Sequence, residues 1–351
     1  MMNMQTNKPT LHPLRLCAVI LILAALFSAG CAAPELSAEA RSVTVFAMDT
    51  VMDLTVYGGD DDLLTEAENM IHFLETEFSV TDPESGLSRL NAAGDFSVGP
   101  DTKSLLASAL ALSDRTDGAF DCTIYPVLRA WGFTSGEYRV PAENELAALL
   151  PLVNWRKVTV SGERVTVGEG QMLDFGAIAK GYTGDRLISL FREAGAASAL
   201  VNLGGNVQLL GKKPDGSLWN VAVADPFGNG YAGILKTADC AVITSGGYER
   251  YFEEDGKIYR HILDPKTGIP ADNGLSSVTV VGERGIVCDA LSTALYVMGA
   301  ERAEAFWRGS DDFEIILLTE DGQIILSEGL EDSFAPSGEW RDAPITVIRH
   351  D

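Results

Sequence analysis

The stretch SSVTVVGERGIVCDALSTALYVMG, residues 276–299, combines a predicted strand with a predicted helix and indicates how the chain folds around it. Residues 276–283 are rich in valine and threonine, which favour strands. Residues 286–299 have the apolar character of a buried helix, yet they contain Asp289 and, four residues later, Thr293. Residues four apart share one face of a helix, so a carboxylate and a hydroxyl would lie together in apolar surroundings. Because a buried charge is costly without a partner, Asp289 needs one.

Hairpins and helices follow one another along the rest of the chain without an internal repeat. Helices are predicted over residues 61–79, 101–118, 144–153 and 179–195, whereas turn formers dominate residues 81–95. Strands are predicted over residues 43–58, 197–211, 219–226 and 233–246, and hairpins over residues 157–168, 247–265 and 313–329. This order is typical of an α+β fold, in which a largely antiparallel sheet with hairpins packs against helices. We expect a single domain over residues 42–348.

The net charge restricts the ligands that the chain can attract. The 351 residues include 26 basic and 50 acidic side chains, which gives a formal net charge of −24 at pH 7. Such a protein repels nucleic acid and anionic surfaces at long range, so we expect no nucleic-acid partner. An anionic small molecule would need a local attraction from a metal ion, a lysine or backbone amides.

The first residues match a bacterial export signal. Lys8 and Arg15 precede the apolar run LCAVILILAALF, residues 16–27, which is too short for a typical membrane-spanning helix. Small residues then lead to Cys31, and this pattern resembles the cleavage box of bacterial lipoproteins, with Ser28 where a larger aliphatic residue is usual. The alternatives are an ordinary signal peptide and a short anchor.

A lipoprotein signal peptide over residues 1–30 implies cleavage before Cys31, lipid attachment to its sulfur and a tether over residues 31–41. The folded part would then be extracytoplasmic and lipid-anchored to the bacterial cell membrane. The cysteines beyond this segment are widely spaced, so we expect neither a disulfide framework nor a zinc site.

The segment LDFGAIAKGYTGDRL, residues 173–187, predicts a strand that ends near Leu173 and a helix that starts near Ala179. The first amides of such a helix attract anions. Lys180 lies in the first turn, where a positive charge is unfavourable for the helix dipole, so it either contacts an anionic ligand or is a solvated surface lysine. Asp174 either caps the helix or accepts hydrogen bonds from a ligand.

His261 alternates with Tyr259 and Leu263 on one face of a predicted strand. An unperturbed histidine pKa of about 6.5 suits a general base, although a lone histidine is more often structural.

Asp289 and Thr293 together offer two oxygen ligands to a metal ion, with Ser292 close enough to assist. Mg²⁺ prefers oxygen ligands and commonly bridges a protein to phosphate groups. The spacing is also compatible with Asp289 as the N-cap of a helix that starts at Ala290, and spacing alone does not favour the metal site over that cap.

The chain resembles the ApbE family, the FAD:protein FMN transferases, over nearly the whole predicted domain. The motifs that carry the resemblance follow in the family's order: FAMDTVMDLTVYG, DPESGLSRLN, DGAFDCTIYPVLRAWGF, DFGAIAKGY, NLGGN, TSGGYERYF, HILDPKTGIP and DALSTALYVMG. Two positions depart from the family pattern. Asp49 replaces a glycine, and Thr81 stands where relatives often have an aromatic residue, so no stacking contact with a ligand is expected there.

The resemblance implies roles for individual residues. Mg²⁺ would be bound by Asp289, Thr293 and the backbone carbonyl of Ala177, with Ser292 close by. FAD would be contacted by Met48, Ala119, Phe120, Asp121, Asp174, Lys180 and Leu263. His261 would activate the hydroxyl group of the acceptor.

The resemblance also implies a reaction. A threonine hydroxyl of an acceptor protein, either a membrane redox subunit or an exported flavoprotein, would attack the pyrophosphate of FAD. FMN would become joined to the acceptor through a phosphoester bond, and AMP would leave. The residues agree with this chemistry, since Mg²⁺ and Lys180 would neutralise the pyrophosphate locally in an acidic protein. The Gly-x-x-x-x-Gly-Lys-Ser/Thr loop is absent from the sequence, and no Rossmann fingerprint opens a predicted helix.

Three alternative functions use some of the same features. Water in place of the threonine would make the protein a Mg²⁺-dependent FAD pyrophosphatase that yields FMN and AMP, and the sequence does not separate the two reactions. A non-catalytic flavin-binding lipoprotein would need neither the metal ligands nor the histidine. A solute-binding lipoprotein would have two lobes with parallel sheets, which the predicted hairpins disfavour.

Overall fold

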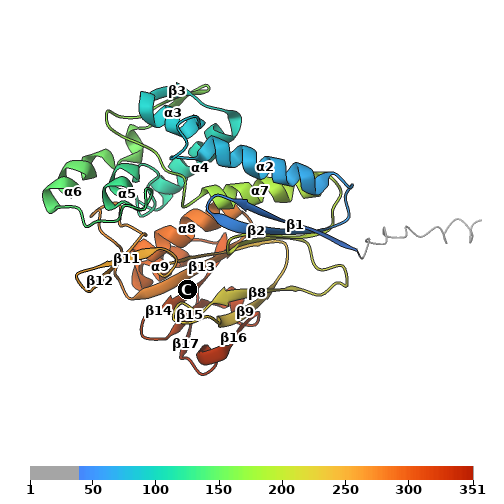
Figure 1. The fold of residues 1–351 in the computed structure, drawn as a ribbon. Coiled ribbons are helices and arrows are strands. Elements are labelled where there is room, and N and C mark those ends of the chain that lie inside the picture. Colours follow the sequence, from blue (N-terminus) through green and yellow to red (C-terminus); the bar gives the residue numbers. More distant parts are fainter. Residues whose placement is uncertain (1–38, 351) are drawn as a thin grey trace, which may run out of the picture.

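The computed structural model describes residues 39–350, and its central feature is a nine-stranded sheet (Figure 1). The strands lie in the order β1 (Ala40–Ala47), β2 (Thr50–Tyr57), β6 (Ser198–Leu203), β7 (Asn206–Leu210), β10 (Ala241–Gly246), β13 (Leu275–Gly282), β14 (Phe313–Thr319), β15 (Ile324–Ser327) and β17 (Ile345–Ile348). Neighbouring strands are antiparallel except for β15 and β17, which are parallel. The predicted α+β fold with a largely antiparallel sheet is therefore confirmed.

Helices cover one face of this sheet, and a smaller sheet packs on part of the other face (Figure 1). The covering helices are α2 (Leu63–Phe78), α4 (Pro100–Arg115), α7 (Ala179–Glu193), α8 (Gly285–Met298) and α9 (Ala300–Arg308). The smaller sheet has the strand order β16 (Phe334–Pro336), β9 (Tyr231–Thr237) and β8 (Trp219–Ala224). Because β13 is covered on both faces, it is buried along nearly its whole length, which agrees with its run of valines.

Helix α8 lies between the sheet and the other helices. It contacts α4, α7 and α9 as well as β10 and β13, and residues on all of its sides are buried. A helix that is apolar all round is expected in such a position. Since α8 begins at Gly285, Asp289 lies inside the helix, and the alternative that placed it at an N-cap before Ala290 is wrong.

Shorter elements complete the fold. The remaining helices are α3 (Gly86–Ala93), α5 (Tyr125–Trp131) and α6 (Glu143–Leu149), and 3₁₀ turns cover Leu150–Leu152, Trp155–Lys157, Glu328–Leu330 and Gly338–Trp340. A three-stranded sheet has the order β3 (Asp95–Ser97), β5 (Arg164–Thr166) and β4 (Thr159–Ser161). A separate two-stranded hairpin consists of β11 (Tyr251–Glu254) and β12 (Lys257–Arg260). The three predicted hairpins, β4–β5, β11–β12 and β14–β15, are all present.

Two local predictions are wrong. The segment 81–95, predicted as turns, contains helix α3, whose N-terminus is capped by the Ser85 hydroxyl accepting a hydrogen bond from the Ser88 amide. No strand ends near Leu173, because the backbone there pairs with isolated partners: the Leu173 amide donates to Asn91 Oδ1 at 2.7 Å, and the Asp174 amide donates to the Cys122 carbonyl at 2.9 Å.

Two hairpin turns lie side by side at one end of the nine-stranded sheet. The glycine pair Gly204–Gly205 forms the turn between β6 and β7, with φ angles of 65° and 93°. Met48 and Asp49 form the turn between β1 and β2, with φ angles of 49° and 58°. A Cβ atom on Gly204 would come within 2.1 Å of Thr50 Oγ1, so the two turns pack directly together.

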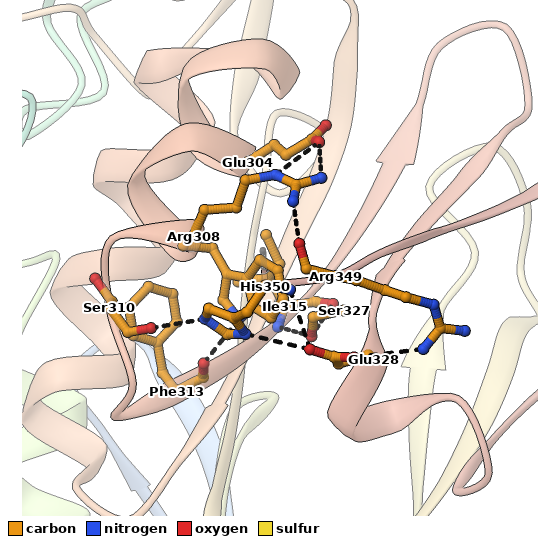
Figure 2. A network of polar contacts seen from close by, with 10 residues as sticks. Glu304, Arg308, Ser310, Phe313, Ile315, Ser327, Glu328, Arg349 and His350 are labelled. Atoms are coloured by element: carbon orange, nitrogen blue, oxygen red, sulfur yellow. Dashed lines mark hydrogen bonds and ion pairs between the residues drawn. The ribbon is translucent and has the colours of Figure 1, made fainter.

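The segment after β17 is held to the rest of the fold by a polar network around His350 (Figure 2). The backbone amide of His350 donates to Glu328 Oε1 at 3.0 Å, and its Nδ1 lies 3.3 Å from the same oxygen. Its Nε2 lies 2.9 Å from the carbonyl oxygen of Ser310. The ring of His350 also lies 4.0 Å, centroid to centroid, from that of Trp307 on α9. These contacts join the segment after β17 to α9 and to the 3₁₀ turn after β15.

The predicted signal peptide over residues 1–30, Cys31 and most of the tether lie outside the described residues. Within residues 39–350, no helix combines the length and the apolar character that are needed to cross a lipid bilayer. The boundaries of a single domain over residues 42–348 stay a prediction.

Candidate active site

The candidate site is built where the first turn of α7 meets the middle of α8. Asp289, which is only 5% exposed, accepts a hydrogen bond at Oδ2 from the Gly181 amide at 2.8 Å. The two helices approach closely at this point, since a Cβ atom on Gly181 would lie 2.3 Å from the carbonyl oxygen of Gly285. Glycine at position 181 therefore lets a carboxylate of one helix reach a backbone amide of the other.

This contact changes the hydrogen bonding at the start of α7. In a regular helix the amide of Gly181 would donate to the carbonyl of Ala177, four residues earlier. It donates to Asp289 instead, and no backbone amide within the described residues 39–350 donates to the carbonyl of Ala177. The Ala177 carbonyl is thus left as an acceptor in the part of α7 that adjoins Asp289.

A second set of contacts orients the hydroxyl groups of α8. The Ser245 hydroxyl at the end of β10 lies 2.8 Å from Ser292 Oγ and 3.1 Å from Thr293 Oγ1. The Ser292 hydroxyl also donates to the Asp289 carbonyl at 2.8 Å, so its proton is used within the protein. As Asp289 and Thr293 are four residues apart within α8, they share one face of the helix as predicted.

Lys180 is the positive charge common to the titratable groups of the site. It favours the ionised forms of Asp174 and Asp289, and it disfavours protonation of His261. Burial is the dominant influence on Asp289 and raises its pKa, while Lys180 and the Gly181 amide act in the opposite direction. A cation at this carboxylate would remove the cost of its burial.

Asp174 forms a tight turn before α7. Its Oδ1 accepts a hydrogen bond from the Gly176 amide at 2.8 Å. The residue at the N-cap of α7 is Ile178, so Asp174 is not the helix cap. Burial raises the pKa of Asp174, while the Gly176 amide and the charges of Arg250 and Lys180 lower it. Hydrogen bonding of Asp174 to a ligand stays a prediction.

His261 follows directly after β12 and has a defined tautomer. Its Nδ1 lies 3.1 Å from the carbonyl oxygen of Arg250, which can only accept a hydrogen bond. The ring proton therefore resides on Nδ1, and Nε2 carries the free lone pair. Burial and then the nearby Arg250 charge lower the pKa of His261 to about 4, so the ring is neutral at pH 7.

The other predicted ligand contacts lie in separate parts of the fold. Met48 is in the β1–β2 turn, where its amide donates to Glu75 Oε1 at 2.6 Å. Asp121 is buried, and its Oδ1 accepts hydrogen bonds from the amide and hydroxyl of Thr123 at 2.8 and 2.7 Å. Leu263 lies in an apolar cluster with Trp131 and Phe133. Ala119 and Phe120 are buried next to Asp121.

Contacts connect only some of these parts with the Asp289 group. The loop of residues 119–122 adjoins Asp174 through the hydrogen bond from the Asp174 amide to the Cys122 carbonyl. Met48 and Ala177 both pack against the core cluster that contains much of α8. Within residues 39–350, Met48 hydrogen-bonds to Glu75 and Leu263 packs in the Trp131 cluster, so neither residue contacts Asp289 through these interactions.

Comparison with known proteins identifies the family. The model of the ApbE family matches residues 48–317, which include every residue of the candidate site. The chain belongs to the ApbE family.

Curated relatives and solved structures of ApbE proteins agree with this assignment. The chain is 35% identical over 303 residues to the FAD:protein FMN transferase of Klebsiella pneumoniae, covering 84% of this chain and 94% of that protein. It is 34% identical to that of Treponema pallidum, covering 77% and 80%. Its fold matches the crystal structure of the ApbE protein of Thermotoga maritima with a TM-score of 0.80 and 32% identity, over 84% of this chain and 99% of that chain. For the apo flavinyl transferase ApbE of Pseudomonas stutzeri the TM-score is 0.76 at 29% identity, over 86% and 98%.

The residues of this ApbE chain fit a hard cation at the α7–α8 contact. Residues 39–350 contain no group of three or more His, Cys, Asp or Glu side chains placed to hold a metal ion. The expected ligand set includes only one carboxylate, and its remaining groups are oxygen atoms of a hydroxyl and a backbone carbonyl. The buried Asp289 and the carbonyl of Ala177, which accepts no backbone hydrogen bond, supply the type of oxygen ligands that Mg²⁺ prefers.

Several residues that shape this ApbE site were not predicted from the sequence. Ser245 supports the hydroxyl groups of α8, Arg250 fixes the tautomer of His261, and Gly181 provides the amide for Asp289. Ser245 and Arg250 both lie in the motif TSGGYERYF, residues 244–252. This motif contributed to the family resemblance, but no role was assigned to its residues. Gly181 lies inside a predicted amphipathic helix, where a glycine that costs helix stability indicates a close approach.

Proposed function

We propose that this chain transfers the FMN moiety of FAD to a threonine hydroxyl of an acceptor protein and releases AMP. The contact between Asp289 and the Gly181 amide carries the proposal, because it sets a buried carboxylate against the first turn of α7 beside Lys180. Membership of the ApbE family and the activity in the names of the curated relatives support it.

The chain's own groups divide the work of the reaction. The pyrophosphate of FAD would lie at the start of α7, where backbone amides and Lys180 attract its negative charge. Asp174 and the loop of residues 119–121 would hold the rest of the dinucleotide. Bound Mg²⁺ would be held by Asp289, Thr293 and the Ala177 carbonyl, and it supplies neutralisation of the pyrophosphate charge.

His261 would receive the proton of the attacking threonine. Its Nε2 lone pair is free, because Nδ1 is bonded to the carbonyl of Arg250. The hydroxyl oxygen forms a bond with the phosphorus of the FMN half, the bond from that phosphorus to the bridging oxygen breaks, and AMP leaves with that oxygen. A neutral histidine at pH 7 is in the correct form to act as the base.

The test is incubation of the protein with FAD, Mg²⁺ and a candidate acceptor that carries a Ser/Thr- and Ala-rich motif, followed by intact-mass measurement. We expect the acceptor to gain the mass of an FMN phosphoester, with equimolar AMP in solution. The variant Asp289→Ala should abolish both and weaken Mg²⁺ binding, whereas Asp321→Asn, an exposed turn residue on the β14–β15 hairpin, should change neither.

Two results would contradict the proposal. Release of FMN and AMP without any mass gain of the acceptors tested would make the protein an FAD pyrophosphatase. Unchanged flavin transfer by Asp289→Ala would remove the metal-binding role of that carboxylate.

We also propose that Cys31 is lipidated and anchors the enzyme outside the cytoplasm. The proposal is supported by the basic residues, the short apolar run and the small residues before Cys31. In bacterial cells, Cys31→Ala should move the protein from the membrane fraction to the soluble extracytoplasmic fraction. Retention of the variant in the membrane fraction would contradict lipid anchoring at this residue.

A further inference from the structure

Helices α7 and α8 are joined by two polar contacts with the same spacing on each helix. The Gly181 amide of α7 donates to Asp289 of α8 at 2.8 Å. One turn further along α7, the Asp185 carboxylate accepts from the amides of Gly285 and Ile286, one turn earlier on α8, at 2.6 and 3.0 Å. Each helix thus offers a carboxylate to backbone amides of the other, and the two contacts are four residues apart on both.

Asp185 acts as the N-terminal cap of α8 from another helix. The first amides of any helix lack partners within the helix. The residue at the N-cap of α8, Arg284, makes no side-chain capping bond. Asp185 supplies both acceptor oxygens instead, and its negative charge is favourable at the positive end of the α8 dipole. Burial raises the pKa of Asp185 to about 6, in spite of both amide bonds.

Close packing beneath this contact leaves little freedom for α8 to shift. The side-chain amide of Gln208 on β7 donates to the Gly181 carbonyl at 2.9 Å. A Cβ atom on Gly285 would lie 1.7 Å from the same Gln208 nitrogen. The start of α8 is therefore held between Asp185 and Gln208, and the position of Asp289 one turn later depends on both.

Asp185 does not belong to the surface that would contact FAD. It lines a polar cavity of about 300 Å³ together with residues of α4, α7, β7 and the start of α8. Lys180, His261 and Asp289 are not part of that lining. An effect of Asp185 on the reaction would consequently pass through the position of α8.

We propose that Asp185 is a positioning residue, which holds α8 by its first amides and thereby sets Asp289 against the start of α7 for Mg²⁺ binding. The inference rests on the proposed function for the role of Mg²⁺. The effect of Asp185 on the start of α8 can be measured without catalytic turnover.

The test compares Asp185→Asn with Glu193→Gln in the full chain. Asparagine keeps the shape but has one acceptor oxygen, and its NH₂ group would face a backbone donor. Glu193 is an exposed residue at the end of α7, so its substitution removes the same charge without contacting α8. Two quantities are measured: amide hydrogen exchange of residues 285–289 by mass spectrometry, and the Mg²⁺ concentration for half-maximal FAD binding, followed by flavin fluorescence.

For Asp185→Asn we expect exchange about tenfold faster in residues 285–289 and a Mg²⁺ requirement raised about tenfold. FAD binding without Mg²⁺ should stay as in the wild type, and Glu193→Gln should match the wild type throughout. A purely structural role would accelerate exchange and leave the Mg²⁺ requirement unchanged, and that result would overturn the proposal. So would unchanged exchange.

A second variant covers the case in which Asp185→Asn does not fold. Asp185→Glu keeps the charge but displaces the carboxylate by one methylene, and we expect the Mg²⁺ requirement to rise about threefold. An unchanged requirement would overturn the proposal. Wild-type protein that binds FAD in a Mg²⁺-dependent manner without transferring FMN would overturn the proposed function alone.

Discussion

Lys180 occupies the first turn of α7, where a positive charge is unfavourable for the helix dipole. Its charge nevertheless lowers the pKa of Asp174, His261 and Asp289. This position is therefore better suited to binding an anion than to stabilising the helix. We expect Lys180→Ala to weaken FAD binding by roughly 1–3 kcal/mol, the value of a hydrogen bond to a charged group. Isothermal titration calorimetry with FAD would measure the loss.

The control for this prediction is Lys236→Ala, since Lys236 is an exposed lysine on β9, away from the site. Equal FAD affinity of Lys180→Ala and the wild type would make Lys180 an ordinary surface residue.

His261 gives a prediction on pH. Its pKa is lowered to about 4, so the neutral form that can accept a proton persists well below the usual histidine pKa of about 6.5. The value of kcat/KM for FMN transfer should therefore hold as the pH falls through 6.5 and decline towards pH 4. His261→Ala should bind FAD normally and lose transfer, while His72→Ala, on the exposed side of α2, should leave the profile unchanged. If kcat/KM instead fell with a midpoint at pH 6.5, His261 would not be desolvated as the structure indicates.

At the residue scale, the sequence predicted those site features that depend on local spacing. Asp289 and Thr293 share a face because they are four residues apart within one helix. The Gly181 amide and the Ser245 hydroxyl could not be predicted as their partners, because those contacts join residues 108 and 48 positions apart. The tautomer of His261 likewise depends on a carbonyl across the β11–β12 hairpin.

At the element scale, the crossing of α7 and α8 depends on glycine. A Cβ atom at position 181 would lie 2.3 Å from the Gly285 carbonyl oxygen and 2.7 Å from Asp289 Cβ. Gly181→Ala should therefore push the helices apart and lower the free energy of unfolding by roughly 1–3 kcal/mol, as overpacking does in a core. Urea denaturation would measure this effect.

Gly230→Ala is the matched control, because a Cβ atom there would meet nothing within 4 Å. We expect its free energy of unfolding to equal that of the wild type within experimental error. If Gly181→Ala were as stable as the wild type and transferred FMN at the same rate, the two helices would have room that the structure does not show.

The long periodic helices were predicted correctly, whereas two short helices were missed. The helices α2, α4 and α7 have enough turns for an apolar face to be visible in the sequence. Helix α3 has only 8 residues, and the turn-forming residues around it outweighed its apolar positions. Helix α5 has only 7 residues, and no element was predicted there. The supposed strand at Leu173 was apolar for another reason, since Leu173 and Phe175 are buried loop residues of the core.

The β1–β2 turn shows how a departure from the family pattern is accommodated. Asp49, which replaces the usual glycine, adopts a φ of 58°. This left-handed region is open to glycine and tolerated by aspartate at some cost. Asp49 thus adopts a backbone conformation that glycine adopts readily, and Met48 lies beside it at the tip of the hairpin.

For the whole molecule, the network around His350 predicts a pH-dependent stability (Figure 2). Both ring nitrogens face acceptors, the Ser310 carbonyl first and then Glu328, and these bonds raise the pKa of His350 above its usual value. A group whose pKa is raised by folding stabilises the protein below its unfolded pKa and loses that contribution as the pH rises through the folded pKa. His350→Ala should thus lower the Tm more at pH 6 than at pH 8.5.

His72→Ala provides the comparison, because His72 is an exposed histidine on α2 and lies outside this network. A loss of Tm for His350→Ala that is equal at both pH values would mean that the ring acts by packing on Trp307 rather than by its charge.

The general architecture of the molecule followed from its sequence, whereas its sheet order did not. Alternating hairpins and helices predicted an α+β fold, since local patterns determine which elements form. The order of the strands brings β2 beside β6 and β10 beside β13, pairs that are separated by long intervening segments. Register between such distant strands is set by tertiary packing, which single-sequence patterns do not contain.

Two very different parts of the chain carry the residues proposed for the reaction. One part binds the phosphate groups of FAD, and the other acts on the acceptor. Asp289 lies in a helix enclosed on every side, whereas His261 continues a hairpin in which Tyr251 and Ile258 are each 53% exposed. Mutations in the first part will damage folding and chemistry together. Directed evolution towards new target proteins should therefore randomise the β11–β12 hairpin and leave α8 untouched.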